Sequence, residues 1–442
     1  MKDFQKSLIS IALPVTLQSL LQSSFSVIDQ VMIGQMGSES IAGIGLGGKF
    51  ASVYSVVLGA VAAVAGIMIA QYIGQKNEKN INKGFYVNLM FAAIIATVFM
   101  AVCLIFTPAI MSVYTKDTAT SILAEKYLRI YSLSFIPMAV STMAAVLLRC
   151  LEAAVFPLVA SFVSVLVNTA LNYLLIFGKF GFPKLGVEGA AIASAISFVI
   201  GGIIITIAVW RHPEISPKGQ SFKPDMEVLK PCLKVAIPNM LQRFGTSLGY
   251  VAFASMINSV GEIATAAHTI ANTVESAFYV PAYGMQTAAA TLAGNAYGAG
   301  DKKRMQNITT LLIVIEVSLM IITGGLLFIF APNMMMLFSN NDEVISVGST
   351  VLRMVALSEP IYGVSIIIEG MMHGVGNTVT PFAFNLIGMW GIRIVGTFIL
   401  TQLFSYGLVA AWGCMILHNV CVFIMFTISY SRGKWNPLYK NS

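Results

Sequence analysis

Long apolar segments follow one another along nearly the whole chain, and they restrict the possible folds more than any other feature. Many of them reach about 18 residues or more, the length at which an apolar helix can cross a lipid bilayer. Of the 442 residues, 57% are hydrophobic and 10% are charged, whereas soluble domains average about 25% charged residues. We therefore predict an all-α integral membrane protein.

Hydropathy and the polar breaks between segments predict twelve transmembrane helices. They are expected near residues 8–34, 41–72, 84–111, 121–147, 154–178, 187–210, 231–257, 264–296, 306–337, 345–371, 379–403 and 406–430. The basic start, with Lys2 and Lys6, runs directly into the first of these helices. That helix is too long for the apolar region of a signal peptide, so no cleaved signal is expected.

Lysine and arginine are unevenly divided between the connecting loops. Most lie at the two termini and in the loops near 74–83, 149, 211–234 and 301–304. The opposite loops hold Lys116, Lys126, Lys179 and Lys184. Because basic loops remain in the cytoplasm, we expect a multi-pass protein of the plasma (inner) membrane with both termini cytoplasmic. The net charge of +7 follows from these loops, and we expect no nucleic-acid partner.

The two halves of the chain repeat one another at a single residue offset. The offset pairs Pro14 with Pro238, Gln18 with Gln242, Gly37 with Gly261 and Pro157 with Pro381. It also aligns IFTP with IFAP, and YLRIYSLS with VLRMVALS. We predict two six-helix lobes related by pseudo-twofold symmetry, at residues 1–210 and 231–442, joined by a cytoplasmic linker at 211–230. Repeats of this kind are typical of transporters.

An acid, Asp29, lies within the first expected span, where a charge is costly. Gln18, Gln22, Ser26 and Asp29 are spaced four, four and three residues apart, so they form a polar stripe on one helix face. Apolar residues continue beyond Asp29, which favours a position inside the bilayer; pairing at the outer interface is the alternative. An acid at bilayer depth indicates a functional site.

The fifth span carries a second polar face. Ser161, Ser164, Asn168 and Asn172 recur at spacings of three and four residues. Buried amides need hydrogen-bond partners, and these are either a bound ligand or neighbouring helices that the amides hold together. The sixth span opens with GVEGAAIASAIS, whose small residues permit close helix approach and which includes Ser194.

The second lobe carries a different polar set. The eighth span has His268, Asn272, Glu275 and Tyr279 at helical spacing, and the positions equivalent to them in the first lobe carry no charge. In the tenth span Glu359 precedes Pro360, a residue that interrupts helices. The two lobes are therefore expected to differ in function.

Motifs of several other protein classes are missing from the sequence. There is no GxxxxGK[ST] or HExxH motif, so nothing indicates ATP binding or the chemistry of a zinc protease. The five cysteines form no CxxC pair, so the paired-cysteine pattern of a common metal site is missing. We expect neither an enzyme nor a bound cofactor.

Three segments resemble the MATE (multidrug and toxic compound extrusion) family. They are ALPVTLQSLLQSSFSVIDQVMIGQMGSESIAGIGLG, VNTALNYLLIFG followed by LGVEGAAIASAIS, and AAHTIANTVESAFYVPAYGMQTAAATLAGNAYGAGD. The resemblance covers essentially the whole chain and includes DinF-like and NorM-like features. It implies a V-shaped secondary transporter that exports amphipathic, often cationic drugs by alternating access, in exchange for H⁺ or Na⁺. Beyond these drugs and the lipid bilayer we expect no partner, and we expect a monomer.

The resemblance also implies roles for individual residues. It places the coupling carboxylate at Asp29 and adds Asn168, Asn172 and Ser194 to the ion-coupling site, with Asp29, Asn168 and Asn172 as the set that would hold Na⁺. DinF-like members frequently have Asp at the position of Asn172. We expect the remaining polar residues to bind substrate: Gln18, Gln22, Ser26, His268, Asn272, Glu275, Tyr279 and Glu359.

The second-lobe cation site of NorM-like members does not transfer directly. The acids of that site register on Thr246 and Tyr362 in this chain. Glu275 and Glu359 are therefore the candidates for a replacement site, as a hypothesis of our own.

A lipid-linked oligosaccharide flippase of the same superfamily is the main alternative. Such proteins typically have more spans and carry basic residues in a central cavity, whereas this chain has embedded acids in both lobes. A membrane enzyme or receptor would need a convergent catalytic set that the sequence does not contain. A channel would lack coupling to an ion.

Overall fold

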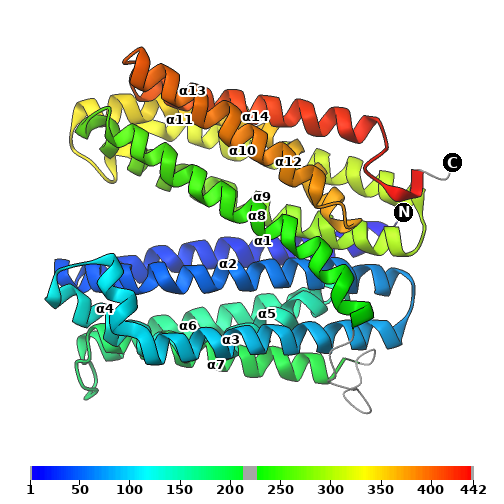
Figure 1. The fold of residues 1–442 in the computed structure, drawn as a ribbon, viewed down its shortest axis with the longest axis horizontal. Coiled ribbons are helices and arrows are strands. Elements are labelled where there is room, and N and C mark those ends of the chain that lie inside the picture. Colours follow the sequence, from blue (N-terminus) through cyan, green and yellow to red (C-terminus); the bar gives the residue numbers. More distant parts are fainter. Residues whose placement is uncertain (1, 213–225, 440–442) are drawn as a thin grey trace. The chain divides into compact units, whose positions relative to one another are not determined.

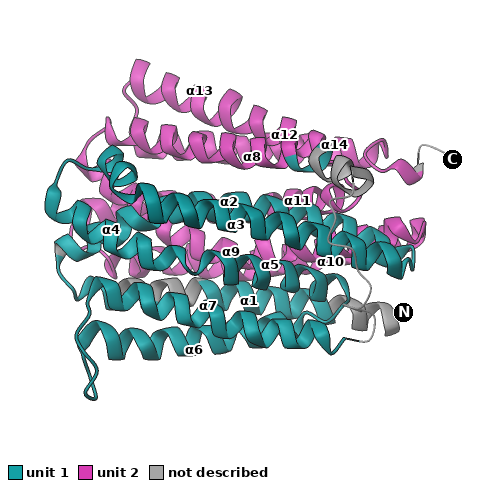
Figure 2. Ribbon diagram, turned by 60° about the horizontal axis from the view of Figure 1, so that its bottom comes forward, with its two compact units in different colours: residues 1–236 teal, residues 237–442 magenta. Residues whose placement is uncertain are grey.

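The computed structural model describes the backbone of residues 2–212 and 226–439. Side chains within these ranges are described except at residues 2–9, 23–27, 30–31, 38, 226–233 and 439. The described chain is helical, with no strand in either range. It divides into two compact units, Met1–Ala236 and Ile237–Ser442 (Figure 2).

Unit 1 is built from the first seven helices (Figure 1). They are α1 (Lys2–Gly34), α2 (Ser38–Gly74), α3 (Glu78–Tyr114), α4 (Thr118–Ser132), α5 (Phe135–Cys150), α6 (Val155–Phe177) and α7 (Val187–Trp210). The single span expected near 121–147 is therefore two helices, α4 and α5, which meet at an angle of 47°. The new helix starts two residues before Pro137, because proline fits the first turn of a helix but not its interior.

Unit 2 contains most of α8 and the remaining helices. They are α8 (Met226–Asn258), α9 (Glu262–Gly298), α10 (Lys302–Met336), α11 (Asp342–Gly374), α12 (Val379–Leu386), α13 (Val395–Thr397) and α14 (Leu408–Ser431). π-Helical turns at Ile387–Ile394 and Phe398–Leu403 join α12 and α13 into one span, and a short 3₁₀ turn follows at Pro437–Tyr439. Residues 213–225, most of the expected linker, lie outside the described residues.

Helix α11 runs through Pro360 from Asp342 to Gly374, in agreement with the single span expected near 345–371. Proline removes one backbone hydrogen bond from a helix. Here α11 packs against α9, α10 and α14, so tertiary contacts hold the helix together across the missing bond. Nothing in the sequence indicated the π-helical turns between Ile387 and Leu403.

The helix starts repeat between the units as the sequence offset requires. Asn77 and Asp301 occupy equivalent positions, and each side chain accepts a hydrogen bond from a backbone N–H in the first turn of the following helix, α3 or α10. Asp117 and Asn341 form the next equivalent pair and cap α4 and α11 in the same way. Caps of this kind satisfy N–H groups that a helix leaves unpaired, so the duplicated sequence fixes where the helices begin.

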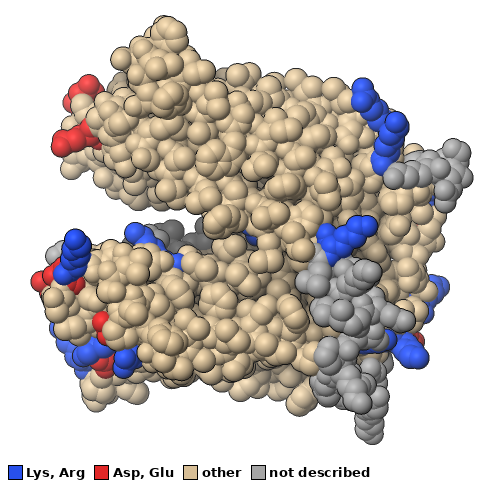
Figure 3. Space-filling view, viewed as in Figure 1, with Lys and Arg blue, Asp and Glu red and all other residues tan. Residues whose placement is uncertain are grey.

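The helices have the lengths and composition of membrane spans. Among the described residues, eight helices are long and apolar enough to cross a bilayer, and the bent pair α4–α5 makes a ninth. On the face drawn in Figure 3, charged side chains gather toward the ends of each unit, and the middle is covered by other residues. The chain is therefore a multi-pass membrane protein.

In unit 1, α6 and α7 approach each other closely at Gly189. A Cβ atom at this position would lie 2.7 Å from the carbonyl oxygen of Leu175 in α6. Only glycine permits that separation, which confirms the close helix approach expected from the small residues of this segment. The approach brings polar side chains of α6 and α7 within hydrogen-bond distance of one another.

Candidate functional site

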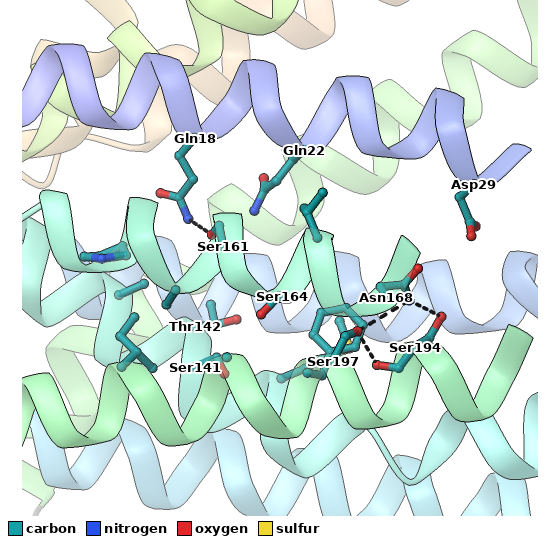
Figure 4. A pocket seen from close by; sticks show the side chains of 18 of the residues that line it. Gln18, Gln22, Asp29, Ser141, Thr142, Ser161, Ser164, Asn168, Ser194 and Ser197 are labelled. Carbon is teal, nitrogen blue, oxygen red and sulfur yellow. Dashed lines mark hydrogen bonds between the residues drawn. The ribbon is translucent and has the colours of Figure 1, made fainter. Parts of the chain in front are cut away.

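A cavity of about 490 Å³ lies inside unit 1 and is walled by α1, α4, α5, α6 and α7. Figure 4 shows the polar side chains that point into it from these helices. Its polar lining consists of Gln18, Gln22, Asp29, Tyr127, Tyr131, Ser141, Thr142, Arg149, Ser161, Ser164, Asn168, Ser194 and Ser197. The stripe on α1 and the polar face of α6 therefore meet across one cavity.

Asp29 lies at one end of this cavity and is held by Asn172. The Nδ2 atom of Asn172 donates to Oδ1 of Asp29 at 2.7 Å, and it also donates to Oδ1 of Asn168 at 2.8 Å. Asp29 is half-buried, whereas Asn172 is fully buried. The Oδ1 atom of Asn172 has no hydrogen-bond partner among the described residues.

The network continues from Asn168 to α7. Its Nδ2 atom donates to the hydroxyl of Ser194 at 3.2 Å and to that of Ser197 at 3.4 Å. The Ser197 hydroxyl in turn donates to the backbone oxygen of Ser194. The structure therefore connects the four residues that the resemblance assigns to ion coupling, although their role in coupling stays a proposal.

The hydrogen-bond directions bear on what Asp29 can bind. Asn172 presents its N–H₂ group to Asp29, and Asn168 uses its carbonyl oxygen to accept from Asn172. Sodium binds oxygen ligands, whereas Asn172 turns its N–H₂ group and not its oxygen toward Asp29. A proton or a cationic group needs only a free oxygen of the carboxylate.

The opposite end of the cavity is formed by residues near the end of α5 and the start of α6. There the Nε2 atom of Gln18 donates to the Ser161 hydroxyl at 2.8 Å. Arg149, in the last turn of α5, lines the same end and is half-buried. It has no hydrogen bond or ion pair to another described residue. Pro157 and Asn168 lie eleven positions apart on α6, which corresponds to about 16 Å at 1.5 Å per residue. The cavity is therefore long, with the acid Asp29 toward one end and the base Arg149 toward the other.

Aromatic rings form one wall of the cavity. Tyr127 and Tyr131 stack with their ring centres 5.3 Å apart, and the ring of Phe198 meets Tyr131 edge-on. The sequence analysis did not single out these residues, although the spacing of the two tyrosines by four in the fourth span was the available signal. The wall gives an apolar, aromatic surface to a bound compound.

Two residues of the expected α1 stripe differ from the rest. Gln22 lines the cavity, and its side chain is exposed. The side chain of Ser26 lies outside the described residues. Asn172 does not line the cavity and acts on it through its bond to Asp29.

The candidate residues of unit 2 do not form one set. His268 lies between aromatic rings, edge-on to Phe253 at 5.5 Å and to Trp412 at 6.0 Å. Tyr279 meets Tyr362 edge-on at 5.5 Å. Asn272 is exposed, so the structure does not bring it to the buried face of α9 that carries the other candidates.

Glu275 and Glu359 are buried in unit 2, and the structure adds a third acid, Glu316. A carboxylate oxygen of Glu359 lies against Gly324 of α10, and Glu316 lies against Gly363 of α11. The carboxylate oxygens of Glu316 and Glu359 have no hydrogen-bond partner among the described residues. The sequence analysis missed Glu316, although it is the one acid in an otherwise apolar segment, LLIVIEVSLMI.

A fourth buried acid of unit 2, Glu369, is fully partnered. Its Oε1 atom accepts from Gln242 at 2.6 Å and from Asn385 at 3.0 Å. His373, one turn later on α11, places Nε2 at 4.0 Å from the same oxygen. The sequence analysis did not select Glu369 either; its place four residues before His373 was the signal.

Within the described residues, no three His, Cys, Asp or Glu side chains are grouped as a metal site would require.

Comparison with known proteins gives matches along nearly the whole chain. The family model MatE matches residues 14–174 and 238–399. The probable multidrug resistance protein NorM of Thermotoga maritima is 26% identical over 434 residues, which cover 98% of this chain and 93% of that protein. The probable multidrug resistance protein YoeA of Bacillus subtilis is 26% identical over 411 residues, covering 90% and 87%.

Solved structures share the fold. A MOP superfamily transporter from Pyrococcus furiosus, described as having a binding pocket of reverse polarity, aligns with a TM-score of 0.91 at 19% identity, over 99% of this chain and 97% of that one. A MATE protein in a bent conformation aligns with a TM-score of 0.90 at 20% identity, over the same shares of the two chains.

Proposed function

Because the chain belongs to the MatE family, we propose that it is a secondary active transporter that exports amphipathic cationic compounds across the plasma membrane in exchange for protons. The names of relatives that cover most of the chain, probable multidrug resistance proteins, support multidrug efflux. The observation that carries the mechanism is the half-buried carboxylate of Asp29 in a cavity of unit 1 that polar side chains line. Such a group can hold either a cationic compound or a proton.

Competition at Asp29 provides the coupling. The carboxylate attracts a cation, and the attraction is strong inside a protein because the effective dielectric constant is low. When Asp29 binds a proton, its charge is lost and the cation is no longer held. A proton arriving from outside thus releases the compound outward, and loss of the proton to the cytoplasm makes the site ready for the next compound.

Competition alone does not move a compound across the membrane. The bound proton or compound must favour one of the two facing states of the transporter over the other. We place the sensing of the bound species in the chain of hydrogen bonds from Asp29 through Asn172 and Asn168 to Ser194. This chain joins α1, α6 and α7, so a change at Asp29 reaches three helices.

A proton is favoured over Na⁺ by the orientation of the two amides. Asn172 donates to Asp29 and Asn168 instead of offering them an oxygen. The lipid-linked oligosaccharide flippase, the alternative from the sequence, is supported less, since it calls for several basic residues in the cavity and the lining contains one, Arg149.

The test is substitution of Asp29 in cells that lack their own exporters. Asp29→Asn should abolish resistance to cationic dyes while the protein is still made and inserted. Asp342→Asn is the matched control, because Asp342 is exposed at the start of α11 and undergoes the same chemical change. Resistance that survives in Asp29→Asn at the wild-type level would remove Asp29 from the mechanism.

The coupling ion is tested with purified protein in proteoliposomes. Independently imposed pH and Na⁺ gradients should give dye movement with the pH gradient alone. Movement that requires Na⁺ at constant pH would contradict proton coupling, and energy-dependent movement of a lipid-linked sugar in place of the dye would favour the flippase.

A further inference from the structure

The end of the unit 1 cavity opposite Asp29 carries a positive charge, and no described residue supplies its counter-charge. The guanidinium of Arg149 is half-buried and has no ion pair with another described residue. Arginine stays charged in proteins, and a buried charge is costly unless it is paired. The repeat between the two halves of the chain identifies what is missing beside it.

The position equivalent to Arg149 in unit 2 is His373, and there an acid is present. Glu369 lies one helical turn before His373, with 4.0 Å between its Oε1 atom and Nε2 of His373. The position equivalent to Glu369 in unit 1 is Ala145, one turn before Arg149 on α5 and in the cavity wall. Unit 1 therefore keeps the basic residue of the pair but has a methyl group in place of the acid.

The hydrogen-bond donors of Glu369 also have polar equivalents in unit 1. Gln242 and Asn385, whose amide groups both donate to Glu369, are equivalent to Gln18 and Ser161. In unit 1 Gln18 and Ser161 hydrogen-bond to each other instead, in the wall of the cavity. In unit 1, the position equivalent to the Glu369 carboxylate therefore has the hydrogen-bonding groups of Gln18 and Ser161 beside it but no acid.

We propose that this end of the unit 1 cavity is an anion subsite formed by Arg149, Gln18 and Ser161. The anionic group of a bound compound, a carboxylate or a group of similar shape, binds where the Glu369 carboxylate lies in unit 2. The rest of the compound extends along α6 toward Asp29, which lies about 16 Å away. The subsite lies in the cavity on which the proposed function rests, but it concerns binding of a compound and not its export.

The test uses two dyes that differ in one carboxylate. Rhodamine 110 has a free carboxylate and a cationic ring system, and rhodamine 123 is its methyl ester. Fluorescence anisotropy with purified protein in detergent measures the affinity for each. The wild type should prefer rhodamine 110, and Arg149→Gln should reduce that preference by about tenfold or more, since it removes a hydrogen bond to a charged group. Arg149→Lys should retain most of the preference.

A second variant tests the subsite without removing Arg149. Ala145→Glu places in unit 1 the acid that unit 2 already has, so it should occupy the subsite and reduce the preference for rhodamine 110 at least as much as Arg149→Gln does. Ala145→Gln adds nearly the same volume without a charge and should lower the affinity for both dyes by a similar factor. Size-exclusion chromatography of each variant establishes that it is folded.

The outcomes separate the subsite from the transport function. Equal wild-type affinity for the two dyes, or a preference that Arg149→Gln and Ala145→Glu leave intact, would overturn the anion subsite while export of cations could still be observed in proteoliposomes. A preference that both variants abolish supports the subsite, even if an imposed pH gradient moves neither dye and the proposed function fails.

Discussion

The close approach of α6 and α7 at Gly189 gives a prediction that links packing to the site. In Gly189→Ala, the new Cβ would lie 2.7 Å from the Leu175 carbonyl oxygen, 2.8 Å from its carbon and 3.0 Å from its Cβ. Backbone atoms cannot turn aside as a side chain can. The two helices must therefore separate by roughly 0.5 Å or more before these contacts reach ordinary van der Waals distance.

That separation affects the polar network as well as the packing. The hydrogen bonds from Asn168 to Ser194 and Ser197 are already 3.2 and 3.4 Å long. Lengthening them by roughly 0.5 Å would break at least one of the two, because hydrogen bonds weaken steeply beyond their usual length. Overpacking costs about 1–3 kcal/mol, and an unmade bond of a buried amide about 1–3 kcal/mol. A total near 2 kcal/mol would lower the melting temperature by about 4–8 °C in a unit of this size.

The assay is thermal unfolding of the purified protein in detergent, followed by dye efflux from cells. Gly45→Ala is the matched control, because Gly45 lies within α2 and a Cβ there would meet nothing within 4 Å. The control should melt at or slightly above the wild-type temperature, since alanine favours helix more than glycine does. Wild-type stability and efflux in Gly189→Ala would refute the account of how α6 and α7 position Asn168.

Three other substitutions test separate parts of the structure. Asn172→Leu should lower the melting temperature by roughly 4 °C or more, because it leaves the buried Asn168 oxygen unpaired; a stability equal to that of the wild type would mean that the network contributes nothing to folding. Glu359→Gln should melt at or above the wild-type temperature, since the buried Glu359 carboxylate has no partner and a neutral side chain of the same shape is cheaper to bury; a clear loss of stability would point to an unseen partner. Asp117→Ala should be less stable than the wild type at neutral pH, because hydrogen bonds from Thr120 hold the pKa of Asp117 below its ordinary value. A carboxylate with a lowered pKa stabilises the fold at pH values above its ordinary pKa, and this stabilisation is lost as the pH falls through the lowered pKa. The difference in melting temperature between the two proteins should therefore shrink in acid, and a constant difference would contradict the role of the charge.

Helical spacing was sufficient to predict the polar faces of α1 and α6. Gln18 and Asp29 lie on one face of α1, and Ser161 and Asn168 on one face of α6, so each face could be identified before its partner was known. The Gln18–Ser161 bond and the link through Asn172 to Asp29 are what two such faces form when they meet. The repeat was equally informative, because it fixed the register in which Ala145 and Glu369 are compared.

Other features depend on tertiary packing, and the sequence did not reveal them. The helix break before Phe135 and the continuous helix through Pro360 show that proline alone does not decide where a span bends. Glu316 was missed because a single acid in an apolar segment has no neighbour in the sequence that explains it. Glu369 was missed because Gln242 and Asn385, which donate hydrogen bonds to it, lie on other helices. Their burial is visible only when α10 and α11 are packed against their neighbours.

The measurement that tests the central claim most directly is proton movement driven by a cationic dye in proteoliposomes without Na⁺. Adding the dye on one side should move protons in the opposite direction with wild-type protein and with Asp342→Asn, and should move none with Asp29→Asn. Dye-driven proton movement of wild-type size in Asp29→Asn would show that the carboxylate in the unit 1 cavity is not the coupling group.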